Sequence, residues 1–200
     1  MIRAVVFDLG KVLVDFDYDI AAPRIAARSH MSPRELIGFL AKCPLLVQYE
    51  TGLLTSDEFY RQISAATGFA GDFAEFSGFF GDIFTPIEPM ISLHATLRRN
   101  RVPTYVFSNT NDLAIRHIRR AFPFFEHFDG FIFSYEHRCM KPDPKLYEVA
   151  ERVSGLSGAD LLYLDDREEN VAAGAARGWQ TILHRDPAET RALVQKLGLC

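Results

Sequence analysis

The chain has 200 residues and a mass of 22.6 kDa, which at about 150 residues per domain allows one core with a small insert and excludes a large multidomain protein. Hydrophobic residues make up 48% of the chain and charged residues 24%, a balance typical of globular rather than disordered proteins. The formal net charge is -4, so no basic surplus points to nucleic acid or to an anionic membrane as a partner.

Buried parallel strands are indicated by short, mostly apolar runs that recur along the chain. The first covers residues 2–7 and ends at Asp8, and the others follow much later, at residues 103–107, 130–133, 161–164 and 179–183. Amphipathic helical segments lie between them, roughly at residues 112–121, 144–154, 168–177 and 187–197. This alternation predicts an α/β fold with a doubly wound parallel sheet.

The segment after the first strand is different, because it carries helix signals without convincing strands. Ser32-Pro33-Arg34-Glu35 and Thr55-Ser56-Asp57-Glu58 both have the spacing of a capping box and predict two helix starts. A third helix that buries an aromatic stripe is predicted by helical spacing of Phe73, Phe76, Phe80 and Phe84.

These signals divide the chain into two predicted units. We expect a small all-helical cap at residues 17–85, inserted after the first strand of a core that comprises residues 1–16 and 86–200. Short hinges near residues 16–18 and 85–89 would join the two.

The cysteines and histidines favour neither a disulfide framework nor a zinc site. The cysteines are few, far apart and without a C-x-x-C pair, which indicates a reducing compartment: Cys43, Cys139 and Cys200. No H-x-x-x-H or H-x-H spacing is present. No apolar run approaches the ~18 residues of a membrane helix, and the chain opens on a strand-like segment rather than a signal peptide. We therefore expect a cytoplasmic protein without membrane partners.

Polar and charged residues follow the predicted strands, at the sheet edge where open α/β folds bind ligands. They are Asp8, Ser108-Asn109-Thr110, Lys141-Pro142-Asp143 and Asp165-Asp166. Carboxylates gathered in this number repel one another unless a hard cation lies among them, and Mg²⁺ is the usual such cation. A site with Mg²⁺, a lysine and hydroxyl donors is suited to a phosphoryl group.

Taken in order, these segments resemble motifs one to four of the haloacid dehalogenase (HAD) superfamily. The motifs are Phe7-Asp8-Leu9-Gly10-Lys11-Val12-Leu13, Phe107-Ser108-Asn109-Thr110, Lys141-Pro142-Asp143 and Leu164-Asp165-Asp166, followed by Asn170-Val171 and Gly174-Ala175. The resemblance covers almost the whole chain and implies a Rossmann-like core with a helical cap of the first type. Within the superfamily, the opening motif and the Ser-Asn-Thr-Asn stretch are most similar to bacterial sugar phosphatases of the glucose-1-phosphate phosphatase type.

The resemblance implies Mg²⁺-dependent hydrolysis through an aspartyl-phosphate. Asp8 would be the nucleophile that attacks phosphorus. Mg²⁺ would be held by an Asp8 oxygen, the main-chain carbonyl of Gly10 and the carboxylate of Asp166. The implied substrate is a small phosphorylated metabolite, such as a sugar 1-phosphate, and no protein partner is required.

Further roles are implied around this centre. Ser108 and the amide of Asn109 would bind the phosphoryl oxygens, while Lys141 neutralises their charge and restrains the nucleophile. Asp165 would orient Lys141 or a metal-bound water, and Asn170 would support the helix after the fourth motif.

Gly10 departs from the family pattern, because most phosphatases of the superfamily have an aspartate there that protonates the leaving oxygen. General acid catalysis is worth about 100- to 10,000-fold. We hypothesise either that the substrate has a good leaving group, such as the anomeric oxygen of a sugar 1-phosphate, or that Asp15 or Asp17 replaces the missing acid. Faster turnover of a sugar 1-phosphate than of its 6-phosphate would support the leaving-group hypothesis, and equal or reversed rates would contradict it.

Each motif also has a plainer structural interpretation. Asp8 and Asp165-Asp166 would be turn residues, residues 108–111 would cap the following helix, and Asp143 would cap the helix that begins at Pro144. For the cap, Glu50-Thr51-Gly52 is interpreted as a helix-connecting turn in preference to a loop facing the site. Lys11 lies with Asp15 and Asp17 on the segment that would line the entrance.

Two other functions stay open from the sequence. A 2-haloacid dehalogenase uses the same nucleophile on carbon and needs neither metal nor a second aspartate, which suits Gly10 but not Asp165-Asp166. A HAD-fold binding protein with weakened catalysis is the alternative outside the enzymes, and retention of Asp8, Lys141 and Asp166 disfavours it. A phosphosugar mutase is disfavoured because it needs the residue that Gly10 replaces.

Overall fold

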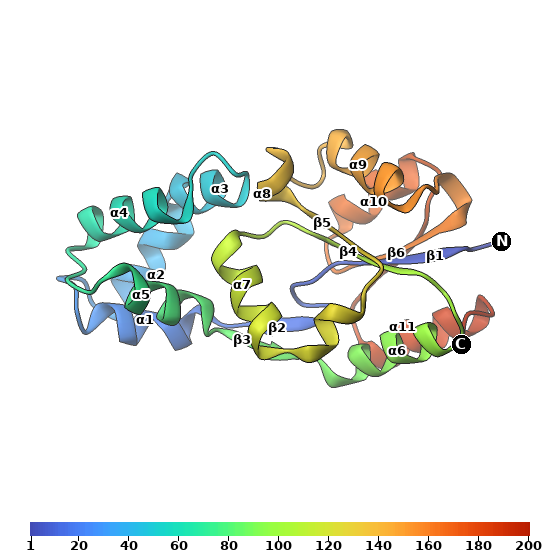
Figure 1. Cartoon of the computed structure of the whole chain (residues 1–200), viewed down its shortest axis with the longest axis horizontal. Helices are drawn as coiled ribbons and strands as arrows, with labels where there is room; N and C mark the ends of the chain where they lie inside the picture. The colour runs from blue at the N-terminus through green and yellow to red at the C-terminus, as the bar shows by residue number, and fades with distance from the viewer.

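A computed structural model describes residues 1–200 and contains one parallel sheet of five strands in the order β5-β4-β1-β6-β7 (Figure 1). The predicted α/β class and doubly wound parallel sheet are thereby confirmed. In the centre, Phe7 of β1 lies opposite Val106 of β4 and Leu164 of β6, so these three strands end at the same edge. The strands are β1 (Ala4–Phe7), β4 (Thr104–Ser108), β5 (Gly130–Phe133), β6 (Leu161–Asp165) and β7 (Gln180–Leu183).

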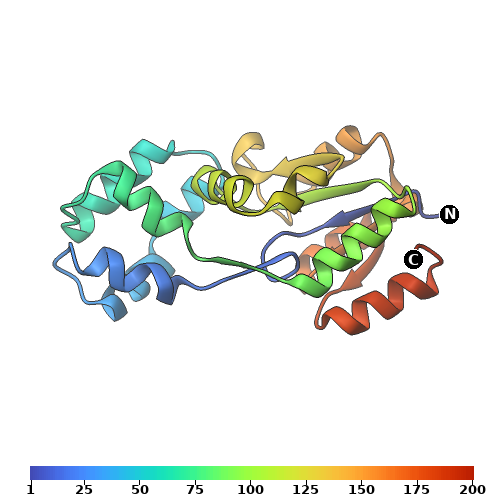
Figure 2. The same cartoon turned by 60° about the horizontal axis from the view of Figure 1, so that its bottom comes forward.

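Both faces of the sheet are covered by helices, as Figures 1 and 2 show. Val5 and Phe7 of β1 point into a cluster with α6, α7 and α11, while Ala4 and Val6 point into a second cluster with α9. A strand buried on both faces has no polar side, which explains its continuous apolar run. The helices are α6 (Glu88–Arg99), α7 (Asp112–Ala121), α9 (Pro144–Ser154), α10 (Glu168–Ala176) and α11 (Pro187–Lys196). No helix of the chain has both the length and the apolar character of a membrane span.

Three short helical turns complete the core. They are η1 (Pro123–His127), α8 (Ser134–His137) and η2 (Gly158–Asp160). The turn that matters for the site is α8, because it follows β5 directly and reaches the cap beside α3, as Figure 1 shows.

The cap consists of five helices around an aromatic core of its own. Both predicted capping boxes are present: the side chains of Ser32 and Thr55 accept from the amides of Glu35 and Glu58, whose carboxylates accept in return. The helices are α1 (Tyr18–Ala26), α2 (Pro33–Lys42), α3 (Pro44–Glu50), α4 (Ser56–Thr67) and α5 (Phe73–Gly81).

The predicted aromatic helix is shorter than expected. Phe76 and Phe80 are buried in the cap, as the spacing predicts, but α5 ends at Gly81. Phe84 belongs instead to a short strand, β3 (Phe84–Pro86), which pairs antiparallel with β2 (Val14–Phe16). The two connections between cap and core therefore form a ribbon rather than two independent hinges. We propose that the cap and core divide along this ribbon.

Candidate active site

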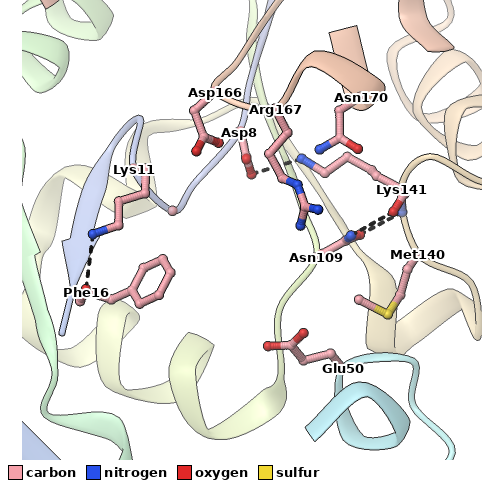
Figure 3. A pocket seen from close by; sticks show the side chains of 11 residues that line it. Asp8, Lys11, Phe16, Glu50, Asn109, Met140, Lys141, Asp166, Arg167 and Asn170 are labelled. Atoms are coloured by element: carbon pink, nitrogen blue, oxygen red, sulfur yellow. Dashed lines mark hydrogen bonds and ion pairs between the residues drawn. The ribbon is translucent and has the colours of Figure 1, made fainter. Parts of the chain in front are cut away.

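The carboxyl ends of the strands open into a cavity of about 390 Å³ between core and cap (Figure 3). Of the predicted site residues, most line it directly: Asp8, Gly10, Asn109, Lys141, Asp166 and Asn170. The other two lie at its floor, where Ser108 lines a smaller adjoining cavity and Asp165 is fully buried. The structure therefore brings together residues from all four motifs.

Lys141 is the buried centre of the site, with a side chain only 1% exposed. Its Nζ lies 2.7 Å from Asp165 Oδ2 and 3.0 Å from Asp8 Oδ1, and it donates to the carbonyl of Phe107 at 2.8 Å. Three acceptors thus surround the three protons of the ammonium group. Burial opposes the charge on Lys141, but the two carboxylates outweigh it and raise the pKa of the ammonium.

Asp165 contacts this lysine and several other donors. In addition to Lys141 it accepts from the Asn170 amide, the Arg167 main-chain N–H at 2.8 Å and the hydroxyl of Tyr163. Burial opposes ionisation of Asp165, yet the lysine and these donors hold the pKa of the carboxyl below its usual range. Because its oxygens already have these partners, Asp165 is suited to orienting Lys141 rather than to binding a ligand.

Asp8 has one oxygen fixed and one free. Its Oδ1 accepts from the amide of Leu9 at 2.6 Å and contacts Lys141, whereas its Oδ2 has no hydrogen-bond partner. The main-chain amide of Asp8 donates to Leu164 at 2.8 Å, which ties the residue to β6. Burial raises the pKa of Asp8, and the Lys141 ammonium opposes that rise. The arrangement presents a carboxylate oxygen to the cavity in a fixed orientation.

Asn109 connects two motifs through its side chain. Its Nδ2 donates to the carbonyl of Lys141 at 2.9 Å, and its Oδ1 accepts from the amide of Lys141 at 2.7 Å. Ser108 at the end of β4 is 2% exposed and donates only a long bond, of 3.3 Å, to the carbonyl of Asn109. The Ser108 hydroxyl is thus available for a stronger acceptor, such as a phosphoryl oxygen.

The donor set fits Mg²⁺. The Asp8 and Asp166 carboxylates provide oxygen ligands, and together with Asp165 their oxygens lie within 4.8 Å of one another, with neither histidine nor cysteine in the group. Burial and then the neighbouring Asp165 raise the pKa of Asp166, as expected for carboxylates that repel one another without a cation. Hard oxygen ligands of this kind suit Mg²⁺. Gly10 lines the same cavity with Asp8 and Asp166.

The residues expected to replace the acid missing at Gly10 do not reach the cavity. Asp15 forms an exposed ion pair with Lys11 and accepts from the amide of Phe16, and Asp17 caps α1 by accepting from Asp19. The hypothesis that one of them is the acid is therefore wrong, although Lys11 does line the cavity as predicted.

Four residues that line the cavity were not among the predicted site residues: Phe16, Glu50, Met140 and Arg167. Glu50 was expected in a helix-connecting turn, and a turn does follow it, but the residue itself ends α3 and faces the site. Met140 and Arg167 directly adjoin the third and fourth motifs, which is the one signal that pointed to them.

Comparisons with known proteins identify the family. The sequence model of the haloacid dehalogenase-like hydrolases matches residues 2–178. D-ribitol-5-phosphate phosphatase of Bacteroides thetaiotaomicron is 24% identical over 96% of both chains, and a sesquiterpene phosphatase of Aspergillus oryzae is 26% identical over 88% of this chain and 86% of its own. A HAD family enzyme of B. thetaiotaomicron, solved with magnesium and inorganic phosphate, shares the fold with a TM-score of 0.79 at 23% identity, over 92% of this chain and 95% of that one. Since the family model covers most of the sequence, the chain belongs to the haloacid dehalogenase-like hydrolase family.

Proposed function

We propose that the protein is a Mg²⁺-dependent phosphatase that hydrolyses a small phosphorylated metabolite, most favourably a sugar or polyol phosphate. The observation that carries the proposal is the geometry of Asp8, whose Oδ1 is fixed by Leu9 and Lys141 while Oδ2 is free at the cavity. A fixed, unshielded carboxylate oxygen is what nucleophilic attack on phosphorus requires.

The residues around Asp8 suit the two steps of such a hydrolysis. Asp8 attacks phosphorus to form an aspartyl-phosphate, and water then hydrolyses it. Ser108 and the main-chain amide of Asn109 bind the phosphoryl oxygens, and Lys141 balances their charge while holding Asp8 in place. Asp8, the Gly10 carbonyl and Asp166 would hold a Mg²⁺ ion, which would supply further positive charge when bound.

The proposed substrate class is supported by the lining of the cavity and by one relative. Only two of the 11 lining residues are hydrophobic, so the cavity offers hydrogen-bond partners to a polyhydroxylated carbon chain. A relative of matching length is named for D-ribitol 5-phosphate. The apolar substrate named for the sesquiterpene phosphatase suits this polar lining less well.

Phosphate release from p-nitrophenyl phosphate tests the reaction. We expect activity that requires Mg²⁺, disappears with EDTA, and is lost in Asp8→Asn, which keeps the shape of the side chain but removes the nucleophile. Thermal unfolding of the variant serves as the control for folding. Halide release from 2-chloropropionate without metal would instead support the dehalogenase, and tight phosphate binding without turnover would support a binding protein.

A further inference from the structure

We propose that Glu50 of the cap replaces the acid missing at Gly10 and protonates the leaving oxygen of the substrate. The inference rests on the proposed phosphatase function and adds the residue that its first step lacks. It rests on three observations: where Glu50 points, what holds it there, and which groups surround it.

Glu50 reaches the cavity from the side opposite the nucleophile. Figure 3 shows its carboxylate directed from the cap helix into the space below Asp8 and Lys141. Its side chain has no ion-pair or hydrogen-bond partner, while every other cap glutamate closes a capping box. The carboxyl is therefore free to contact a substrate. The leaving group of an in-line reaction departs away from Asp8, toward this side.

The core fixes the position of Glu50 even though the residue belongs to the cap. The Ser134 hydroxyl of α8 donates to the Glu50 carbonyl at 2.5 Å and accepts from the amide of Thr110. Two residues later, Gly52 has a φ of +71°, and a Cβ there would lie 2.0 Å from the carbonyl oxygen of Tyr135. These contacts press the end of α3 against the core at the loop after β4, beside Ser108 and Asn109.

Charged and titratable groups face Glu50 from each neighbouring element. Tyr18 comes from α1, Arg167 precedes α10, Lys11 follows β1, and the cluster around Asp8 forms the cavity floor. From α8, Ser134 offers only its hydroxyl, and Tyr135 lines a different pocket. Burial raises the pKa of Glu50 to about 7, with Arg167 opposing the rise. A carboxyl that keeps its proton near neutrality is suited to general acid catalysis.

An oxygen of Asp8 forms a bond to phosphorus while the bond from phosphorus to the leaving oxygen breaks, and the electron pair of that bond stays on the leaving oxygen. This oxygen takes the proton of the Glu50 carboxyl and departs as an alcohol. In the second step water attacks phosphorus, the bond to Asp8 breaks, and a proton of that water returns to the Glu50 carboxylate.

The test compares p-nitrophenyl phosphate with phenyl phosphate, which have similar size but leaving groups of different basicity. With enzyme in excess, release of the phenol reports only the first step. Phenolate is the more basic leaving group, so its departure depends more on protonation than that of nitrophenolate. Glu50→Gln should therefore slow the first step with phenyl phosphate about 100-fold and change the rate with p-nitrophenyl phosphate by about threefold or less. The wild-type rate with phenyl phosphate should also fall as pH rises through 7, and the variant should lack this fall.

Glu126→Gln, on the exposed surface of η1, is the matched control and should behave as wild type. If Glu50→Gln slowed both substrates equally, the role of Glu50 would be overturned. The same would follow if the wild-type enzyme preferred p-nitrophenyl phosphate over phenyl phosphate as steeply as the Glu50→Gln variant does. Either result would leave the phosphatase proposal intact. A wild-type protein that releases no phosphate from either substrate would remove the phosphatase proposal itself. Circular dichroism of both variants checks that they fold.

Discussion

At the scale of single residues, the buried charges of the site depend on Lys141. Asp8 and Asp165 are both buried, and the one cation in contact with them is the Lys141 ammonium. Removing one partner of a buried ion pair leaves the other charge without compensation, which costs more than the pair contributes. The Lys141 ammonium therefore compensates the charge of both buried carboxylates in the folded protein.

Lys141→Met should therefore lower the free energy of unfolding by about 3–5 kcal/mol, measured by urea denaturation in the absence of metal. Lys145→Met is the matched control: Lys145 is exposed, so its replacement should stay within about 0.5 kcal/mol of wild type. Equal stability of the two variants would show that the carboxylates find compensation elsewhere.

The sequence predicted the residues of the site that lie at or just after the end of a strand. Asp8, Ser108 and Asp165 stand where apolar strands end, and parallel strands bring their carboxyl ends to one edge. Glu50 was not predicted, because it is placed by Ser134 and by the contact of Gly52 with α8, interactions between residues far apart in the chain. Such contacts leave no signal in the residues next to Glu50 in the sequence.

At the scale of elements, the end of α3 is held against α8 by a contact that only glycine permits. Gly52→Ala introduces a strained φ and a clash with the Tyr135 carbonyl, so the end of α3 must shift away from the core. We expect a loss of about 1–3 kcal/mol of unfolding free energy together with slower turnover of phenyl phosphate. Gly38→Ala in α2 meets no atom within 4 Å and should stabilise the protein by about 0.5–1 kcal/mol. If Gly52→Ala matched that control, the contact would not position Glu50.

The elements that could be predicted from the sequence are those that carry a clear signal in their own residues. The five core strands were predicted from continuous apolar runs, and α2 and α4 from their capping boxes. Helices α1, α3 and α6 were not predicted: α1 contains Pro23, α3 has seven residues, and neither α3 nor α6 has a side-chain N-cap. The ribbon of β2 and β3 has three residues per strand and was also missed. Tertiary packing stabilises such elements more than local signals do.

At the scale of the whole molecule, the core beneath the sheet holds a buried histidine with one ring nitrogen that has no hydrogen-bond partner. His94 of α6 is 2% exposed and stacks on Phe128 with ring centroids 3.9 Å apart. Its Nε2 has no hydrogen-bond partner. The imidazole therefore packs as an aromatic ring, and its protonation would place a charge in the cluster that joins α6 and α11 to the sheet.

This burial makes folding sensitive to mild acid. Burial, with help from the nearby Arg98 guanidinium, lowers the pKa of His94 from 6.5 to about 4. As pH falls below 6.5, His94 becomes protonated in the unfolded chain but stays neutral in the folded protein. The free energy of unfolding therefore declines until about pH 4, by roughly 3 kcal/mol from this group. His94→Phe keeps the stacked ring without the titration, and urea unfolding from pH 7 to pH 4 should show a shallower decline for it than for wild type. Parallel declines would mean that carboxylates, rather than this histidine, set the acid sensitivity of the fold.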